Sequence, residues 1–167
     1  MDYIRYHRKR DRSRLGGDWA ELIARFAKKY APDAQKVLDL GCGRGFLVHE
    51  FKDNGIHTYG IDLRNIFEFE RPSMSFADAK SLPFRDKTFD VITEAYTLSD
   101  MLELQKYNHD KINAVAKEAL RVLKPGGCFI THPGNSVNLS FFGFKDVTEK
   151  DNYFFKKGII AVYRRPT

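Results

Sequence analysis

The sequence predicts a doubly wound α/β domain, in which helices cover both faces of a mostly parallel sheet. Three observations lead to this prediction. Short apolar segments alternate along the chain with longer segments whose apolar residues recur at helical spacing. A loop with Gly41, Gly43 and Gly45 directly follows the first short apolar segment. Two extended segments end the chain and are close enough in sequence to form an antiparallel hairpin at the edge of the sheet.

The first half of the chain supplies a helix, a strand and a second helix. Residues 19–30 carry apolar side chains at helical spacing, and Asp18 with Glu21 forms a capping pair at their start. Residues 36–40, Lys-Val-Leu-Asp-Leu, are a short apolar run that is typical of a buried strand. After the glycine loop, we expect a helix from about residue 44 to residue 53.

The second half supplies the remaining strands and one long helix. Further parallel strands are expected where short extended stretches occur: residues 57–63, 73–78, 89–97 and 128–132. Residues 109–123 have the apolar spacing of a helix, and Pro-Gly-Gly at 125–127 is expected to stop it. The closing hairpin is expected from residues 145–155 and 158–164, joined by Lys157 and Gly158.

The chain length and charge suggest one domain preceded by a basic arm. The 167 residues are enough for a single hydrophobic core, which we assign to residues 15–167. Residues 1–14 hold six Arg and Lys residues against two Asp residues, and so carry most of the net charge of +6. Two interpretations stay open: a solvated tail, which the charge alone favours, or a patch that attracts RNA or DNA.

Several classes of protein are disfavoured by composition. No apolar run approaches the roughly 20 residues that a membrane-spanning helix needs. Residues 1–14 lack the apolar region of a secretory signal. Cys42, Cys128 and the five histidines show no metal-ligand spacing and suggest no disulfide framework. The sequence therefore predicts a cytoplasmic protein with no metal site and no membrane association.

The glycine loop predicts a nucleotide-like ligand at the carboxyl ends of the parallel strands. A dinucleotide fits poorly, because Phe46 occupies the third glycine position of the G-x-G-x-x-G pattern and Gly45 falls one residue early. Asp39, in the strand before the loop, also disfavours a dinucleotide, because its carboxylate would be poorly placed next to a pyrophosphate. A carboxylate suits a ligand with a cationic amino group, and S-adenosylmethionine has such a group and no phosphate.

Four segments, in order and at suitable spacing, resemble the class I S-adenosylmethionine-dependent methyltransferases over roughly residues 19–164. They are VLDLGCGRG, GIDL, DAKSLPFRDKTFDVI and EALRVLKPGG. The chain looks most similar to the broad subgroup that contains ubiquinone/menaquinone-type methyltransferases. The resemblance implies a Rossmann-like methyltransferase fold with a seven-stranded sheet, and S-adenosyl-L-methionine as the cofactor.

The resemblance also assigns roles to the first strand and its loop. Asp39 would lie near the methionine amino group, shaping the loop or bonding through water. Gly41 and Gly43 would let the backbone approach the cofactor closely, because a Cβ would collide there. Cys42 lies between them and is assigned to the cofactor-binding loop with them. We interpret it as a small loop residue rather than a nucleophile, because nothing nearby in sequence would activate it.

Further cofactor contacts are implied after the second and third strands. Asp62 would accept hydrogen bonds from both ribose hydroxyls, and Leu63 would pack on the adenine. Asp78 would accept from the adenine amino group, and Ala79 would offer a backbone contact. Taken alone, either aspartate would more commonly be a turn residue or helix cap. Their order behind the glycine loop favours ligand contact.

Candidate catalytic residues lie at the ends of the fourth and fifth strands. Methyl transfer depends mainly on positioning the acceptor, so a dedicated base is optional. Glu94 would face the junction of cofactor and acceptor, and His132 can titrate near neutral pH. Tyr96 and Asp100 are further candidates. A purely structural, hydrogen-bonded role for His132 is an equal alternative.

The acceptor and the partners are expected from indirect features. Only about a dozen residues separate the fifth and sixth strands, too few for a helical lid, and an open site suits RNA or protein slightly better than a small molecule. Tyr3 and Tyr6, interleaved with arginines, would suit base stacking or a lid over the cofactor. A homodimer stays open. The alternatives are a non-catalytic, cofactor-binding partner subunit and, less favoured, a nicotinamide-dependent oxidoreductase.

Overall fold

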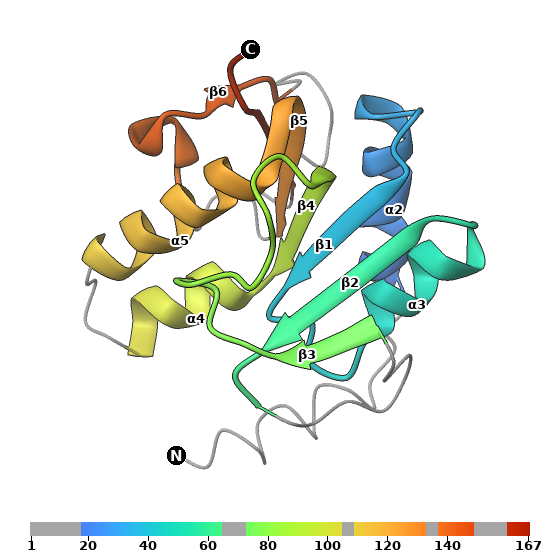
Figure 1. Cartoon of the computed structure of the whole chain (residues 1–167), viewed down its shortest axis with the longest axis horizontal. Coiled ribbons are helices and arrows are strands. Elements are labelled where there is room, and N and C mark those ends of the chain that lie inside the picture. Colours follow the sequence, from blue (N-terminus) through green and yellow to red (C-terminus); the bar gives the residue numbers. More distant parts are fainter. Residues whose placement is uncertain (1–17, 65–72, 105–108, 133–136, 149–159) are drawn as a thin grey trace.

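The computed structural model describes residues 18–64, 73–104, 109–132, 137–148 and 160–167, which form the α/β fold shown in Figure 1. Its strands form one seven-stranded sheet in the order β3-β2-β1-β4-β5-β7-β6. The five strands from β3 to β5 are mutually parallel, whereas β7 runs antiparallel to both β5 and β6. The predicted fold class is therefore confirmed.

The strand bounds follow the predictions closely in the first half of the chain. The strands are β1 Lys36–Leu40, β2 His57–Asp62, β3 Met74–Phe76, β4 Phe89–Ala95, β5 Leu123–His132, β6 Lys145–Asp146 and β7 Ala161–Arg164. The expected turn of the final hairpin lies outside the described residues. The Pro-Gly-Gly segment was expected to precede the fifth strand, and this was wrong. It lies inside β5, where the pairing with β4 shifts register between Phe89 and Val91, as at a β-bulge.

Four α-helices and one short 3₁₀-helix are found in the described part of the chain. They are α2 Asp18–Tyr30, α3 Phe46–Asp53, α4 Thr97–Leu104, α5 His109–Val122 and the 3₁₀-helix Leu139–Phe142. The sequence did not predict α4, because residues 89–97 were expected to continue as strand. Instead β4 ends at Ala95, and a left-handed residue, Tyr96 at φ +66°, turns the chain into α4.

Alternating side chains of the central strands build a separate core on each face of the sheet. Leu38, Leu40 and Ile92 belong to a buried cluster that includes residues of α4 and α5. Val37 and Val91, one position away, belong to a second cluster with residues of α2 and α3. In Figure 1 the pair α4 and α5 accordingly lies on the opposite side of the sheet from the pair α2 and α3. Among the described helices, none is both long and apolar enough to cross a membrane.

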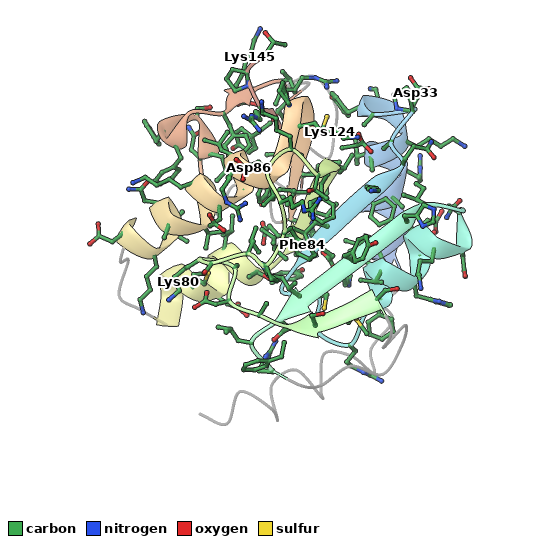
Figure 2. The ribbon with its side chains drawn as sticks, viewed as in Figure 1. Asp33, Lys80, Phe84, Asp86, Lys124 and Lys145 are labelled. Carbon is green, nitrogen blue, oxygen red and sulfur yellow. The ribbon has the colours of Figure 1, made fainter. Side chains whose placement is uncertain are left out.

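The loop between β3 and β4 is fastened to α5 by one arginine. Arg121 donates to the carbonyl oxygens of Leu82 and Phe84, at 3.0 and 2.7 Å, and pairs with Asp86 at 2.8 Å. The same guanidinium pairs with Glu118, whose carboxylate accepts from the backbone N–H of Leu82. Phe84 and Asp86 can be followed along this loop in Figure 2. These bonds fix the segment for which the resemblance implies adenine contacts.

Candidate functional site

The glycine loop lies between β1 and α3, and each of its three glycines has a left-handed backbone. The φ angles are +67° at Gly41, +54° at Gly43 and +93° at Gly45. Residues with a Cβ rarely adopt this conformation, so the glycines at these three positions allow the path that the loop follows. The loop thus leaves β1, turns at the carboxyl end of the sheet and enters α3 at Phe46.

Gly41 is also required by a neighbour that the sequence did not indicate. A Cβ at Gly41 would lie 2.0 Å from Oγ1 of Thr97, the first residue of α4. That hydroxyl donates to the carbonyl oxygen of Leu40 at 3.0 Å, so it cannot move without losing a bond. At Gly43, in contrast, no described atom lies within 4 Å of the Cβ position. The structure therefore adds a packing reason for Gly41 to the expected role of close approach to a ligand.

Asp62 joins the end of β2 to the glycine loop. Its side chain is buried, and Oδ2 accepts a hydrogen bond from the backbone N–H of Gly43 at 3.0 Å. Oδ1 accepts from the backbone N–H and the Nε of Arg64, at 2.8 and 3.1 Å. Leu63 lies between Asp62 and Arg64 in the chain and is 56% exposed, so it is accessible to a flat ligand. Asp62 thus lies beside the glycine loop, and its contact with a ribose stays a prediction.

Asp78 has the contacts of a turn residue. Its Oδ1 accepts from the backbone N–H of Lys80 at 2.9 Å, and its Oδ2 lies 3.2 Å from the Lys80 ammonium nitrogen. The neighbouring Ala79 packs against the core cluster beneath α5. The alternative that the sequence offered for Asp78, a turn role, is therefore the one that these contacts support. The contacts of Asp78 and Ala79 with adenine stay predictions.

Asp39 is a buried carboxyl group next to the loop. Its Oδ1 accepts from the hydroxyl of Thr93 at 3.0 Å, and only 3% of the residue is exposed. Burial raises the pKa of Asp39 to about 8, because desolvation penalises the charged form, and the nearby charges of Glu94 and Asp62 act in the same direction. A cationic group beside Asp39 would favour the charged form, which is the electrostatic feature expected of the amino-group site.

Glu94 is directed into the protein at the start of α4. It is fully buried; its Oε2 accepts from the backbone N–H of Leu98 at 3.1 Å and its Oε1 from the hydroxyl of Thr131. Burial raises the pKa of Glu94 to about 7, although these hydrogen bonds act against the rise. Glu94 therefore satisfies backbone donors at a helix N-terminus and fastens α4 to β5. A contact with cofactor or acceptor stays a prediction.

These carboxyl groups predict a pH dependence of stability. The pKa of Asp39 rises from an ordinary 3.8 to about 8, so the folded protein binds this proton more tightly than the unfolded chain. The resulting stabilisation is complete below the unfolded pKa and is lost as pH rises through the folded one. We expect the free energy of unfolding to fall by about 1 kcal/mol or more between about pH 5 and about pH 8.

The measurement is urea unfolding across this pH range for the wild type and for Asp39→Asn. The amide keeps an acceptor for Thr93 but has no proton to lose, so the fall should become shallower. Asp33→Asn, at an exposed turn before β1 (Figure 2), is the matched control and should keep the wild-type slope. An unchanged slope in Asp39→Asn would show that Asp39 is charged in the folded protein at neutral pH.

Cys42 packs as a core residue. Its Sγ lies 3.6 Å from Sδ of Met74, and its backbone N–H donates to the carbonyl oxygen of Ile61 at 2.9 Å. Burial raises the pKa of this thiol, which makes it a poor nucleophile. Gly60 lies close to it, because a Cβ there would come within 2.7 Å of the sulfur. The packing supports the interpretation of Cys42 as a small loop residue.

His132, at the carboxyl end of β5, meets two aromatic rings. Its Nε2 lies 3.1 Å from the hydroxyl oxygen of Tyr96, whose ring meets the imidazole edge to face with centroids 5.0 Å apart. The Trp19 ring lies parallel to the imidazole, at 6.5 Å between centroids. The sequence indicated His132 and Tyr96 separately, but no signal in it linked them to each other or to Trp19, which was expected only as a helix residue.

The structure brings most of the predicted site together at one edge of the sheet. The glycine loop, Asp39, Asp62 and Glu94 lie at the carboxyl ends of β1, β2 and β4, and the charges of Asp62 and Glu94 act on Asp39. Tyr3, Tyr6 and the rest of the basic arm lie outside the described residues. Within the described part of the chain, no group of three or more His, Cys, Asp or Glu residues is arranged to hold a metal ion.

Comparison with known proteins gives one family. A sequence profile described as a methyltransferase domain matches residues 38–131. The ubiquinone/menaquinone biosynthesis C-methyltransferase UbiE of Desulfotalea psychrophila is 34% identical over 128 residues, which cover 69% of this chain and 48% of that protein. The chain spans 30% to 48% of the length of four curated relatives that it matches.

Two solved structures share the fold. The PH0226 protein from Pyrococcus horikoshii aligns with a TM-score of 0.72 at 20% identity, over 94% of each chain. CalS10, an amino pentose methyltransferase from Micromonospora echinaspora whose structure contains bound S-adenosylmethionine, aligns with a TM-score of 0.63 at 23% identity. That alignment covers 77% of this chain and 55% of CalS10. At these identities the likeness shows the fold alone.

Proposed function

The chain belongs to the class I S-adenosylmethionine-dependent methyltransferases, and on that basis we propose that it transfers a methyl group to a small-molecule acceptor. S-adenosyl-L-methionine is the cofactor of this family, and CalS10 was solved with it bound. When bound, it supplies a methyl group activated by a positively charged sulfur. The chain's own residues would bind the cofactor, orient the acceptor and receive the acceptor's proton.

The observation that carries this proposal is the Asp62 carboxylate. It lies at the carboxyl end of β2, it is buried, and it is held against the glycine loop through Gly43. Each carboxylate oxygen has two acceptor positions, and bonds from Gly43 and Arg64 use all four. A pair of adjacent hydroxyls would take the place of the two bonds from the Arg64 side chain, which lies at the surface side of the site. A ribose presents such a pair. Asp39 would complement the amino group of the same ligand, and exposed Leu63 would pack on its flat base.

We propose a small molecule as the acceptor, in place of the RNA or protein that the sequence slightly favoured. The preference for RNA or protein rested on residues 1–14, which lie outside the described structure, and on the short stretch after β5. Two of the proteins found by comparison carry names of small-molecule enzymes: UbiE is named for quinone biosynthesis and CalS10 for an amino pentose. These names support the class of acceptor and leave its identity to experiment.

The test combines a binding measurement with a transfer measurement. Calorimetry with S-adenosylmethionine and, separately, with NADH should give binding of the first only. Radioactive methyl label should then enter the organic-soluble or aqueous metabolite fraction of a cell extract, and not its RNA or protein. Label in RNA or protein would contradict the small-molecule proposal. Binding without label in any fraction would support the alternative of a non-catalytic partner subunit.

A further inference from the structure

The contact between Tyr96 and His132 joins two polar side chains from neighbouring strand ends. Ala95 and His132 are paired in the β4–β5 register, so the residue after Ala95 is brought beside the imidazole. The phenol oxygen and Nε2 are 3.1 Å apart, a hydrogen-bonding distance. His132 is buried, whereas Tyr96 is half-buried, so the tyrosine lies on the more accessible side of the pair.

The backbone of Tyr96 is strained and is held in place on both sides. Its φ of +66° is unusual for a residue with a Cβ and costs roughly 1–2 kcal/mol. Its N–H donates to the carbonyl oxygen of His132 at 2.6 Å, and its own carbonyl oxygen accepts from Asp100 N–H and the Ser99 hydroxyl, each at 2.8 Å. At this residue the chain leaves β4, and the phenol of the same residue contacts His132.

This pair lies next to the glycine loop. Thr97, the residue after Tyr96, donates to the carbonyl oxygen of Leu40 and occupies the space behind Gly41. Tyr96 therefore directly precedes in the chain the residue that contacts the loop that would hold the methyl donor. Figure 1 shows α4 leaving the same end of the sheet at which β1 enters this loop. An acceptor in line with the donor would enter from this region.

We propose that Tyr96 is a catalytic residue that takes a proton from the acceptor, and that His132 is its positioning residue. This inference rests on the proposed methyltransferase function. It specifies an acceptor whose nucleophilic atom carries an acidic proton, as a hydroxyl group or an activated carbon does. When that atom forms its bond to the methyl carbon, the sulfur keeps the electron pair of the broken carbon–sulfur bond and one proton must leave the acceptor.

The geometry gives that proton a path. The acceptor's proton moves to the Tyr96 oxygen, and the phenol's own proton moves to Nε2 of His132, which later releases it to water. The bond from the Tyr96 backbone N–H to the His132 carbonyl oxygen keeps the two residues side by side, and the Trp19 ring lies parallel to the imidazole. Charge and proton number are balanced, because the sulfur loses its positive charge as the imidazole gains one.

The test uses Tyr96→Phe, which removes one oxygen and keeps the ring that packs on His132. With the metabolite fraction that accepts label, kcat should fall by at least about a hundredfold, the usual range for loss of a general base. The affinity for S-adenosylmethionine and the KM for the acceptor fraction should change by less than about threefold. Tyr59→Phe, on β2, is the matched control and should keep the wild-type rate.

His132→Gln and nitrogen NMR test the positioning role. His132→Gln should also lower kcat. The imidazole resonances of His132 are assigned as those that are present in the nitrogen NMR spectrum of the wild type and absent from that of His132→Gln. In Tyr96→Phe the Nε2 resonance of His132 should shift, because its hydrogen-bond partner is gone. Near-wild-type transfer by Tyr96→Phe, or an unmoved Nε2 resonance, would overturn the inference. A wild-type protein that binds the cofactor and labels nothing would overturn the proposed function instead.

Discussion

Replacing Asp62 by alanine should weaken S-adenosylmethionine binding by about a hundredfold or more. If Asp62 binds the ribose as proposed, the change removes two charge-assisted hydrogen bonds, each of which contributes about 1.5–3 kcal/mol. It also removes the acceptor that holds the Gly43 N–H at 3.0 Å, so the glycine loop loses its tie to β2. Isothermal titration calorimetry of the two purified proteins measures the effect directly.

A second variant and a control separate binding from folding. Asp62→Asn keeps one side-chain oxygen for Gly43 and loses the charge, so its affinity should fall between those of the wild type and the alanine variant. Asp33→Ala removes an exposed carboxylate before β1 and should bind normally. If Asp62→Ala folds and its affinity lies within about threefold of the wild-type value, the assignment of the ribose site is wrong.

The fold could be predicted because its signals are local. The glycine loop, the acidic residue that ends β2 and the helical spacing of α5 each lie within one short segment of sequence. Their order then indicates a parallel sheet, since a helix between two strands carries the chain back so that both strands run in the same direction. The bounds of α2 and β1 were accordingly predicted to within one residue.

The contacts within the site could not be predicted, because they depend on register between strands. Thr131 reaches Glu94, and Thr93 reaches Asp39, only because β4 pairs in one register with β1 and with β5. A slip of one residue would direct the same side chains to the opposite face. The helix α4 was missed for a related reason: its start is stabilised by Glu94, which in the sequence reads as part of a strand.

The contact of Gly41 with Thr97 has the same long-range origin, and it predicts a large loss of stability. In Gly41→Ala the new Cβ would lie 2.0 Å from Oγ1 of Thr97, and the residue would keep a φ of +67°. Overpacking costs about 1–3 kcal/mol and the left-handed backbone a further 1–2 kcal/mol. We therefore expect the free energy of unfolding, measured in urea at one pH, to fall by about 3 kcal/mol.

Gly43→Ala and a double variant separate the two causes. Gly43 has a similar φ of +54°, but no described atom lies within 4 Å of its Cβ position, so its replacement should cost only about 1 kcal/mol. In the double variant of Gly41→Ala and Thr97→Ala the collision is gone. Its loss should be smaller than the sum of the two single losses by about 1–2 kcal/mol. Equal losses in Gly41→Ala and Gly43→Ala would mean that backbone conformation alone, and not α4, requires the first glycine of the loop.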